Sequence, residues 1–232
     1  MKKITSVLLL LSLLLSLAAC PAPTPDAPTV RGYTMTVADA EISSLFCRET
    51  NVIYRRAPFG EYLPGAMSKT VYATAVLENN TTLSFYKIKD QNPHEFIFQA
   101  DPYDSYPTHL LYSSTVSLPT LREMAVTDIL ICDASADYFW RDANVIDKIR
   151  LYDRVHALVV AYEDGERLSD EQLPNGEIVL SAELIFVSGA YKFNAVISLS
   201  QYEDGTILLS SSRGTVAVSP NLFDGYALEW ES

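Results

Sequence analysis

The apolar run at the N-terminus, Ile4–Leu17, sets the first limit on what this chain can fold into. The run is almost entirely Leu, Val and Ser, and the basic residues Lys2 and Lys3 precede it. Its length is typical of the hydrophobic region of an export signal and is short of the roughly 20 apolar residues that a membrane-spanning helix needs. Four prolines follow within residues 21–28, and proline disfavours a helix there. We therefore expect the packed part of the protein to begin after residue 31.

The end of this apolar run carries a second signal, the tetrapeptide Leu17-Ala18-Ala19-Cys20. Small residues before a cysteine at this position resemble the lipobox of bacterial lipoproteins. The resemblance implies that residues 1–19 are a signal peptide and that Cys20 becomes the S-diacylated first residue. It also implies a protein of the cell envelope, held on the extracytoplasmic side of a bacterial membrane. The alternative is an ordinary signal peptide cut at the Ala-Ala site, with Cys20 incidental.

Residues 20–31 are expected to form a tether. Proline at every second or third position favours extended polyproline II structure, which acts as a semi-rigid spacer of roughly 3 Å per residue. Such a spacer would lift the folded part of the protein off the lipid surface.

The charge of the chain excludes some classes of partner. The formal net charge is −12, and it becomes −14 when Lys2 and Lys3 are removed with the signal peptide. A domain this acidic repels phosphate backbones and anionic lipid headgroups, so nucleic acid is not expected as a partner. Solubility alone is the alternative explanation of the charge.

Roughly 200 residues follow the tether, enough for one domain or two small ones. We expect a β-rich N-terminal lobe at 32–117 and an α+β C-terminal lobe at 118–232, with a single domain as the alternative. β-branched and aromatic residues favour strands in the first lobe. These strands are expected at Val52–Arg56, Thr70–Leu77, Leu83–Lys89, Glu95–Gln99 and Leu110–Ser114.

The second lobe combines a short turn, a buried strand, a helix and a meander. Thr120 and Glu123 stand at capping-box spacing in the turn Leu118–Glu123, and Asp128–Cys132 has the composition of a buried strand. Apolar residues at three- and four-residue steps predict a helix from about Ala143 to Tyr162. The predicted stripe consists of Ile146, Ile149, Tyr152, Val155, Val159 and Tyr162, with Asp142 as N-cap and Asp164-Gly165 as the stop.

His156 lies beside this stripe, and a packed or half-exposed side chain is favoured there over a catalyst. Four strands are expected after the helix, at Ile178–Val187, Tyr191–Gln201, Thr206–Ser210 and Thr215–Val218. The fold class is therefore α+β, rich in mostly antiparallel sheet, with one long amphipathic helix packed on a C-terminal meander.

Two cysteines remain beyond Cys20, namely Cys47 and Cys132, and each ends a mostly apolar stretch. An even pair in an oxidising compartment favours a disulfide. Two independent buried thiols are the alternative, and both interpretations stay open because pairing cannot be deduced from sequence.

The loop Asp101–Pro107 is the strongest candidate for ligand binding. Asp101, Tyr103, Asp104 and Tyr106 stand in this loop together with two prolines, and such residues bind sugar hydroxyls or Ca²⁺ or form an interaction edge. The alternative is an exposed turn whose tyrosines cover a neighbouring strand. Asp133 and Asp137, close to Tyr138 and Trp140, form a second and weaker candidate.

Known catalytic patterns are not supported. Ser84 and Lys87 match the Ser-x-x-Lys pattern of penicillin-recognising enzymes, but they lie in an expected strand, where positions three apart point to opposite faces. His94-Glu95 begins like a zinc-binding helix, but Phe98 stands where the second histidine would be. We therefore assign no catalytic residue, metal or cofactor.

The expected function is that of a lipid-anchored extracytoplasmic protein that acts without catalysis, as a binding or envelope-assembly module. Its expected partners are the membrane, through the N-terminal lipid, and proteins of the envelope. The alternative function is a carboxylate-based hydrolase of envelope or extracellular polymers, because the separation of two carboxylates depends on the fold.

Overall fold

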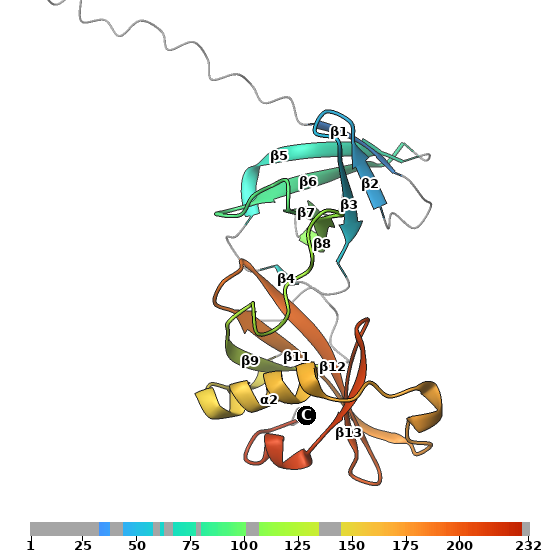
Figure 1. Ribbon diagram of the computed structural model, residues 1–232, viewed down its shortest axis with the longest axis vertical. Helices are drawn as coiled ribbons and strands as arrows, with labels where there is room; N and C mark the ends of the chain where they lie inside the picture. The colour runs from blue at the N-terminus through green and yellow to red at the C-terminus, as the bar shows by residue number, and fades with distance from the viewer. Residues whose placement is uncertain are drawn as a thin grey trace, which may run out of the picture. The chain divides into compact units, whose positions relative to one another are not determined.

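The computed structural model describes residues 33–37, 44–57, 61–62, 67–77, 80–100, 107–134 and 145–228. Residues 32–232 form one compact unit, and its described part contains a closed barrel and a second, open sheet. Strands dominate and are mostly antiparallel, and the helix α2 packs with the second sheet (Figure 1). The predicted β-rich α+β fold class is confirmed.

The barrel is closed by one parallel pairing. Its strands follow the order β1-β2-β3-β8-β7-β6-β5, and β1 returns to pair in parallel with β5, where Tyr33 faces Ala73. All other pairings in it are antiparallel. The strands are β1 (Tyr33–Val37), β2 (Ser44–Cys47), β3 (Val52–Arg56), β5 (Met67–Val76), β6 (Thr82–Ile88), β7 (Phe96–Ala100) and β8 (Pro107–Ser113).

The second sheet has the order β10-β9-β11-β12-β13-β14, and all its pairings are antiparallel. The short strand β4 (Glu61–Tyr62) also pairs with β12. The predicted four-stranded meander is confirmed as β11 to β14. The strands are β9 (Val126–Asp133), β10 (Val145–Ile149), β11 (Ile178–Ser188), β12 (Phe193–Tyr202), β13 (Ile207–Ser211) and β14 (Gly214–Val218).

The helix α2 (Tyr152–Asp164) is shorter than the sequence predicts, because Val145–Ile149 forms the edge strand β10. Ile149 is fully buried and stands opposite Ile129 of β9. Over the five residues Val145–Ile149, the spacing of apolar residues does not distinguish a strand from a helix. Hydrogen bonding to β9 makes this stretch a strand. Leu151 is the N-cap in place of Asp142, which lies outside the described residues.

The buried stripe of α2 also differs from the predicted one. Tyr152 is 75% exposed, and Leu158, which the prediction leaves out, is fully buried. Val155, Val159 and Tyr162 are buried as expected. The helix ends at Asp164, so the predicted stop at Asp164-Gly165 is confirmed.

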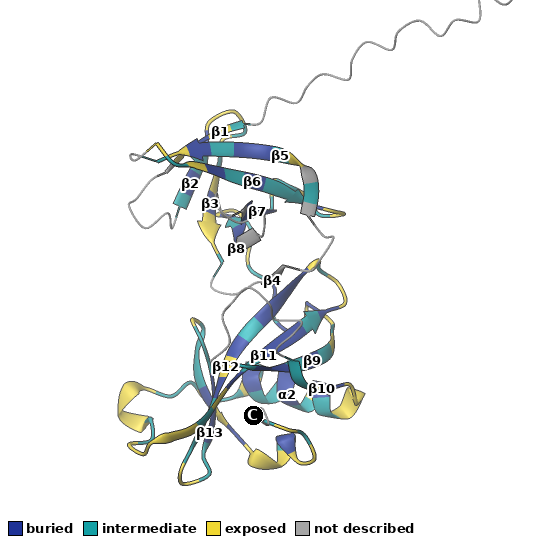
Figure 2. Cartoon of the chain, turned by 180° about the vertical axis from the view of Figure 1, so that it is seen from behind, coloured by how far each residue is buried: buried dark blue, intermediate teal, exposed yellow. Residues whose placement is uncertain are grey.

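Hydrophobic residues form two clusters. One fills the barrel and includes Leu45, Tyr54 and Phe85. The other lies between α2 and the second sheet, and it also contains Phe96 and Phe98 of β7. Since successive side chains of a strand point to opposite faces, β7 contributes to both clusters, with Ile97 in the barrel cluster. Burial of both faces explains why β7 is apolar at consecutive positions. The buried stretches of the strands and of α2 are drawn in dark blue in Figure 2.

The two cysteines are buried thiols and are not bonded to each other. Cys47 ends β2 inside the barrel cluster, whereas Cys132 lies on β9, opposite Glu183 of β11. The disulfide is therefore not formed in the structure, which places Cys47 on a strand of the barrel and Cys132 on a strand of the second sheet. Among the described residues, no helix combines the length and the apolar character that crossing a membrane requires.

Candidate functional site

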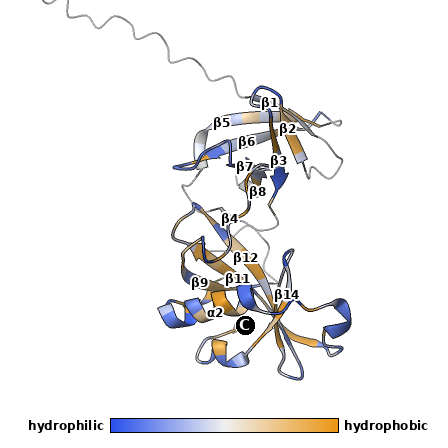
Figure 3. Ribbon diagram, viewed as in Figure 1, coloured by the Kyte–Doolittle hydropathy of each residue, from blue (hydrophilic) through white to orange (hydrophobic). Residues whose placement is uncertain are grey.

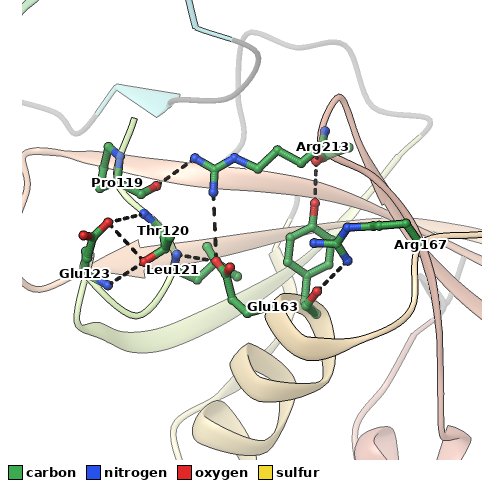
Figure 4. A network of polar contacts seen from close by, with 9 residues as sticks. Pro119, Thr120, Leu121, Glu123, Glu163, Arg167 and Arg213 are labelled. Atoms are coloured by element: carbon green, nitrogen blue, oxygen red, sulfur yellow. Dashed lines mark hydrogen bonds and ion pairs between the residues drawn. The ribbon is translucent and has the colours of Figure 1, made fainter. Parts of the chain in front are cut away.

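A network of polar contacts surrounds the C-terminal end of α2, and we call it the α2 clasp (Figure 4). It joins three parts of the chain: the segment that precedes β9, the last turn of α2, and the turn between β13 and β14. Its residues are Pro119, Thr120, Leu121, Glu123, Tyr162, Glu163, Arg167, Ser211 and Arg213.

Glu163 is the centre of the clasp. Its Oε1 accepts the backbone N–H of Leu121 at 2.6 Å and lies 4.0 Å from Nη1 of Arg213. The Nη2 of Arg213 donates to the carbonyl of Pro119 at 2.8 Å. The side chains of Arg213 and Glu163 are only 25% and 14% exposed, so this ion pair is screened by solvent less than a surface pair.

The segment before β9 is shaped by the predicted capping contact. The backbone N–H of Thr120 donates to Oε2 of Glu123 at 2.8 Å, and the N–H of Glu123 donates to Oγ1 of Thr120 at 3.2 Å. The bonds that the Glu123 carboxylate accepts from the N–H and the hydroxyl of Thr120 favour its charged form and lower the pKa of Glu123. The reciprocal contact expected between Thr120 and Glu123 is therefore confirmed.

Electrostatics explains why arginines gather here. Glu163 and Asp164 end the helix, where the unpaired carbonyls make negative charge unfavourable. Arg122 pairs with Asp164, and its hydrogen bond lowers the pKa of that carboxyl. Arg167 donates to the carbonyl of Tyr162 at 2.6 Å and lies 4.7 Å above the Tyr162 ring. The arginines thus offset the charge at the end of α2.

The chemistry of the clasp is that of a structural joint. The side chains of Glu163 and Arg213 are mostly buried and hold backbone groups of distant segments. A buried or half-buried charge that is engaged in this way stabilises the fold, and removing one partner costs more than removing both. We assign the clasp to fold stability.

A second polar cluster lies inside the barrel. The hydroxyl of the fully buried Tyr54 donates to the carbonyl of Pro93 at 2.8 Å and lies 3.4 Å from the hydroxyl of Tyr72. Burial raises the pKa of Tyr54 far above its usual 10 and also raises the pKa of Tyr72. Both phenols stay neutral at physiological pH, so their role is hydrogen bonding.

The predicted site residues fall in different places. Cys20 and the loop residues Asp101, Tyr103, Asp104 and Tyr106 lie outside the described residues, as do Asp137, Tyr138 and Trp140. Asp133 ends β9 and is half-buried.

The residues of the catalytic and zinc-binding patterns considered in the sequence lie in the described part of the structure. Ser84 and Lys87 lie on the strand β6, which agrees with the rejection of the Ser-x-x-Lys pattern. His94 and His156 are exposed, and the His156 ring lies 5.9 Å from that of Tyr152. In the described part of the chain, no three side chains of the His, Cys, Asp or Glu type come together as a metal site would require.

Sequence reasoning missed two features. Glu163 and Arg213 form an ion pair although they stand 50 positions apart in the sequence. No local sequence pattern predicts a contact over that separation. The start of β11 was expected as a strand, but its side chains Ile178 and Val179 are about half exposed. Two adjacent β-branched residues directly after Glu177 were the available signal for this second feature.

The chain was also compared with known proteins. No protein-family model, no curated protein and no solved structure matches it.

Proposed function

We propose that this chain is a lipid-anchored protein of the bacterial envelope, with a folded part that binds other envelope components without catalysis. The observation that carries the proposal is the tetrapeptide Leu17-Ala18-Ala19-Cys20 at the end of the apolar run Ile4–Leu17. Diacylation of Cys20 would make this cysteine the first residue of the mature protein.

The physics of the anchor supports this proposal. Each buried CH₂ of an acyl chain contributes about 0.8 kcal/mol, so two chains hold a protein stably where one chain is marginal. The first described strand, β1, begins at Tyr33. The residues between Cys20 and β1 would span up to about 35 Å as polyproline II, enough to separate the barrel from lipid headgroups.

The described surface supports a binding role. The charged groups of the α2 clasp and the barrel tyrosines Tyr54 and Tyr72 are engaged in internal hydrogen bonds. In contrast, large apolar side chains are exposed in adjacent pairs, at Leu151 and Tyr152 and at Ile178 and Val179, and singly at Ile53 and Val76. Exposed apolar and aromatic side chains are common in protein interfaces. Envelope proteins are therefore the proposed partners.

Metabolic labelling tests the anchor. Labelled palmitate should enter the wild-type chain in its native host, and Cys20→Ser should remain an unlabelled precursor that still carries residues 1–19. The matched control Cys132→Ala removes a different cysteine and should keep the label. Wild-type protein without label would contradict the anchor.

Incubation with isolated envelope polymers tests the absence of catalysis. The purified full chain should release no soluble fragments from them, and proteins cross-linked to it in intact envelopes should be recovered with it. Release of fragments in proportion to the protein added would favour the hydrolase and contradict the binding role.

A further inference from the structure

The strand β11 extends beyond one of its two neighbours. β12 pairs with β11 from Ile178 to Phe186, whereas β9 pairs with it only from Ala182 to Ser188. Within the described residues, Ile178–Ser181 therefore has a strand on one edge only. We call this four-residue segment the β11 edge.

Three of the four side chains of the β11 edge face solvent, whereas Leu180 is half-buried and packs against the core cluster of the second sheet. Ile178 is 50% exposed and Val179 is 54% exposed, and Ser181 is also exposed. The pairing with β12 shifts between Ile178 and Leu180, which marks a β-bulge at Val179. β-branched residues are typical of strands that pair and pack on both sides, so their exposure here indicates a surface that can still take up a partner.

Carboxylates surround the β11 edge. Glu177 precedes it, and the backbone N–H of Glu203 donates to the carbonyl of Glu177 at 3.2 Å. Asp204 follows Glu203, and all three residues are exposed. The segment between α2 and β11 is mostly hydrophilic, and Glu177 is its last residue (Figure 3).

The negative charge is concentrated in the half of the chain that contains β11. Residues 118–232 carry 19 Asp and Glu against eight Lys and Arg, whereas residues 32–117 carry nine against six. An anionic surface attracts cationic partners and repels anionic ones, including a second copy of itself.

From these observations we propose that the β11 edge takes up an extended, cationic and partly apolar segment of another protein as an added strand. The proposal rests on the proposed binding function and names the kind of partner. Backbone N–H and C=O groups of a strand edge supply the affinity in such strand addition, and no described strand pairs with this edge. Apolar side chains of the added strand would pack on Ile178 and Val179, and its cationic side chains would face Glu177 and Glu203.

A short synthetic peptide of alternating Lys and Val is a suitable probe for the full chain in detergent micelles. Binding should slow amide hydrogen exchange in residues 178–181 by about tenfold, because pairing protects backbone amides. A peptide with an N-methyl group on every amide keeps charge and side chains but has no backbone N–H on either edge, and it should not protect these residues. A Glu-Val peptide should not bind.

Two matched pairs of variants locate the site. Val179→Ser should weaken binding of the Lys-Val peptide by about fivefold, which corresponds to about 1 kcal/mol, whereas the control Leu151→Ser should leave it within about twofold. The double variant Glu177→Gln/Glu203→Gln should also weaken it by about fivefold. Its control, Glu166→Gln/Glu171→Gln, makes the same change in net charge and should leave binding nearly unchanged. Val179→Thr replaces Val179→Ser if the serine variant lacks a thermal unfolding transition.

Three results would overturn the proposal. They are an absence of binding by the Lys-Val peptide, equal protection by the N-methylated peptide, and equal effects of the variants and their controls. Dimerisation of the chain through residues 178–181 would also overturn it, because the occupant would then be a second copy. None of these results depends on the lipid, so a failed palmitate label would leave the test of the edge intact.

Discussion

Glu163, in the last turn of α2, accepts the backbone N–H of Leu121 at 2.6 Å, across 42 positions of the sequence. This bond and the pair between Arg122 and Asp164 fix the segment before β9 to the helix. The bond to Leu121 also places a carboxylate where the helix carbonyls disfavour it, and Arg213 offsets that charge.

Replacement of Glu163 tests the clasp. Glu163→Ala leaves the N–H of Leu121 without its acceptor and Arg213 without its carboxylate, so we expect a loss of about 1–3 kcal/mol in the free energy of unfolding. Glu163→Gln keeps an acceptor oxygen and should lose less. Urea unfolding measures both values, and equal losses for the two variants would show that the bond to Leu121 contributes little.

Acid unfolding tests the pair between Arg122 and Asp164. The pKa of Asp164 is lowered from its usual 3.8 in the folded state, so its contribution is present above the unfolded pKa. It is lost as the pH falls through the folded pKa. We expect stability to fall below about pH 4, with a shallower fall in Arg122→Gln. Arg150→Gln, which removes a more exposed arginine 3.9 Å from Asp128, is the control and should keep the wild-type slope.

Alkaline unfolding tests the buried tyrosine pair. The pKa of Tyr54 is raised by burial, so the neutral phenol is favoured by folding and its contribution is present below the unfolded pKa. The unfolded chain ionises near pH 10, and stability should fall as the pH rises above this value. Tyr54→Phe should lose about 1 kcal/mol at neutral pH through its bond to Pro93 and should reduce the alkaline fall. An unchanged alkaline slope in this variant would assign the fall to other groups.

Gly165 tests the close approach at the end of α2. A Cβ at this position would lie 2.5 Å from the carbonyl oxygen of Ala161 and 3.1 Å from the Val216 side chain. We therefore expect Gly165→Ala to destabilise the protein by about 1–3 kcal/mol through overpacking. Gly176→Ala meets no atom within 4 Å and should be neutral or slightly stabilising. The two thermal unfolding curves make the comparison, and equal midpoints would contradict the steric argument.

Structural features that depend on residues close together in the sequence were predictable from it. The meander from β11 to β14 follows from apolar strands separated by turn residues, such as Glu203-Asp204-Gly205 between β12 and β13. The bonds between Thr120 and Glu123 join residues only three positions apart. The stop of α2 at Gly165 is equally local.

Features that join distant residues were not predictable. The stretch Val145–Ile149 carries helix-like spacing, but β9 offers it backbone partners and it becomes a strand. The closure of the barrel by β1 and β5 and the contact between Glu163 and Leu121 have no local signature. The sequence predicts the part of the clasp formed by Thr120 and Glu123, because these residues are close in the sequence. It does not predict the part that Arg213 adds, because Arg213 is distant in the sequence from its partners.

The sequence by itself determined most of the short segments that become strands and turns, since alternation of side chains and turn chemistry act over a few residues. Only the tertiary structure decided which strands pair, where α2 begins and which apolar side chains stay exposed. Pairing depends on the free energy of closing loops and burying surface across the whole chain, and no short window of residues contains that information.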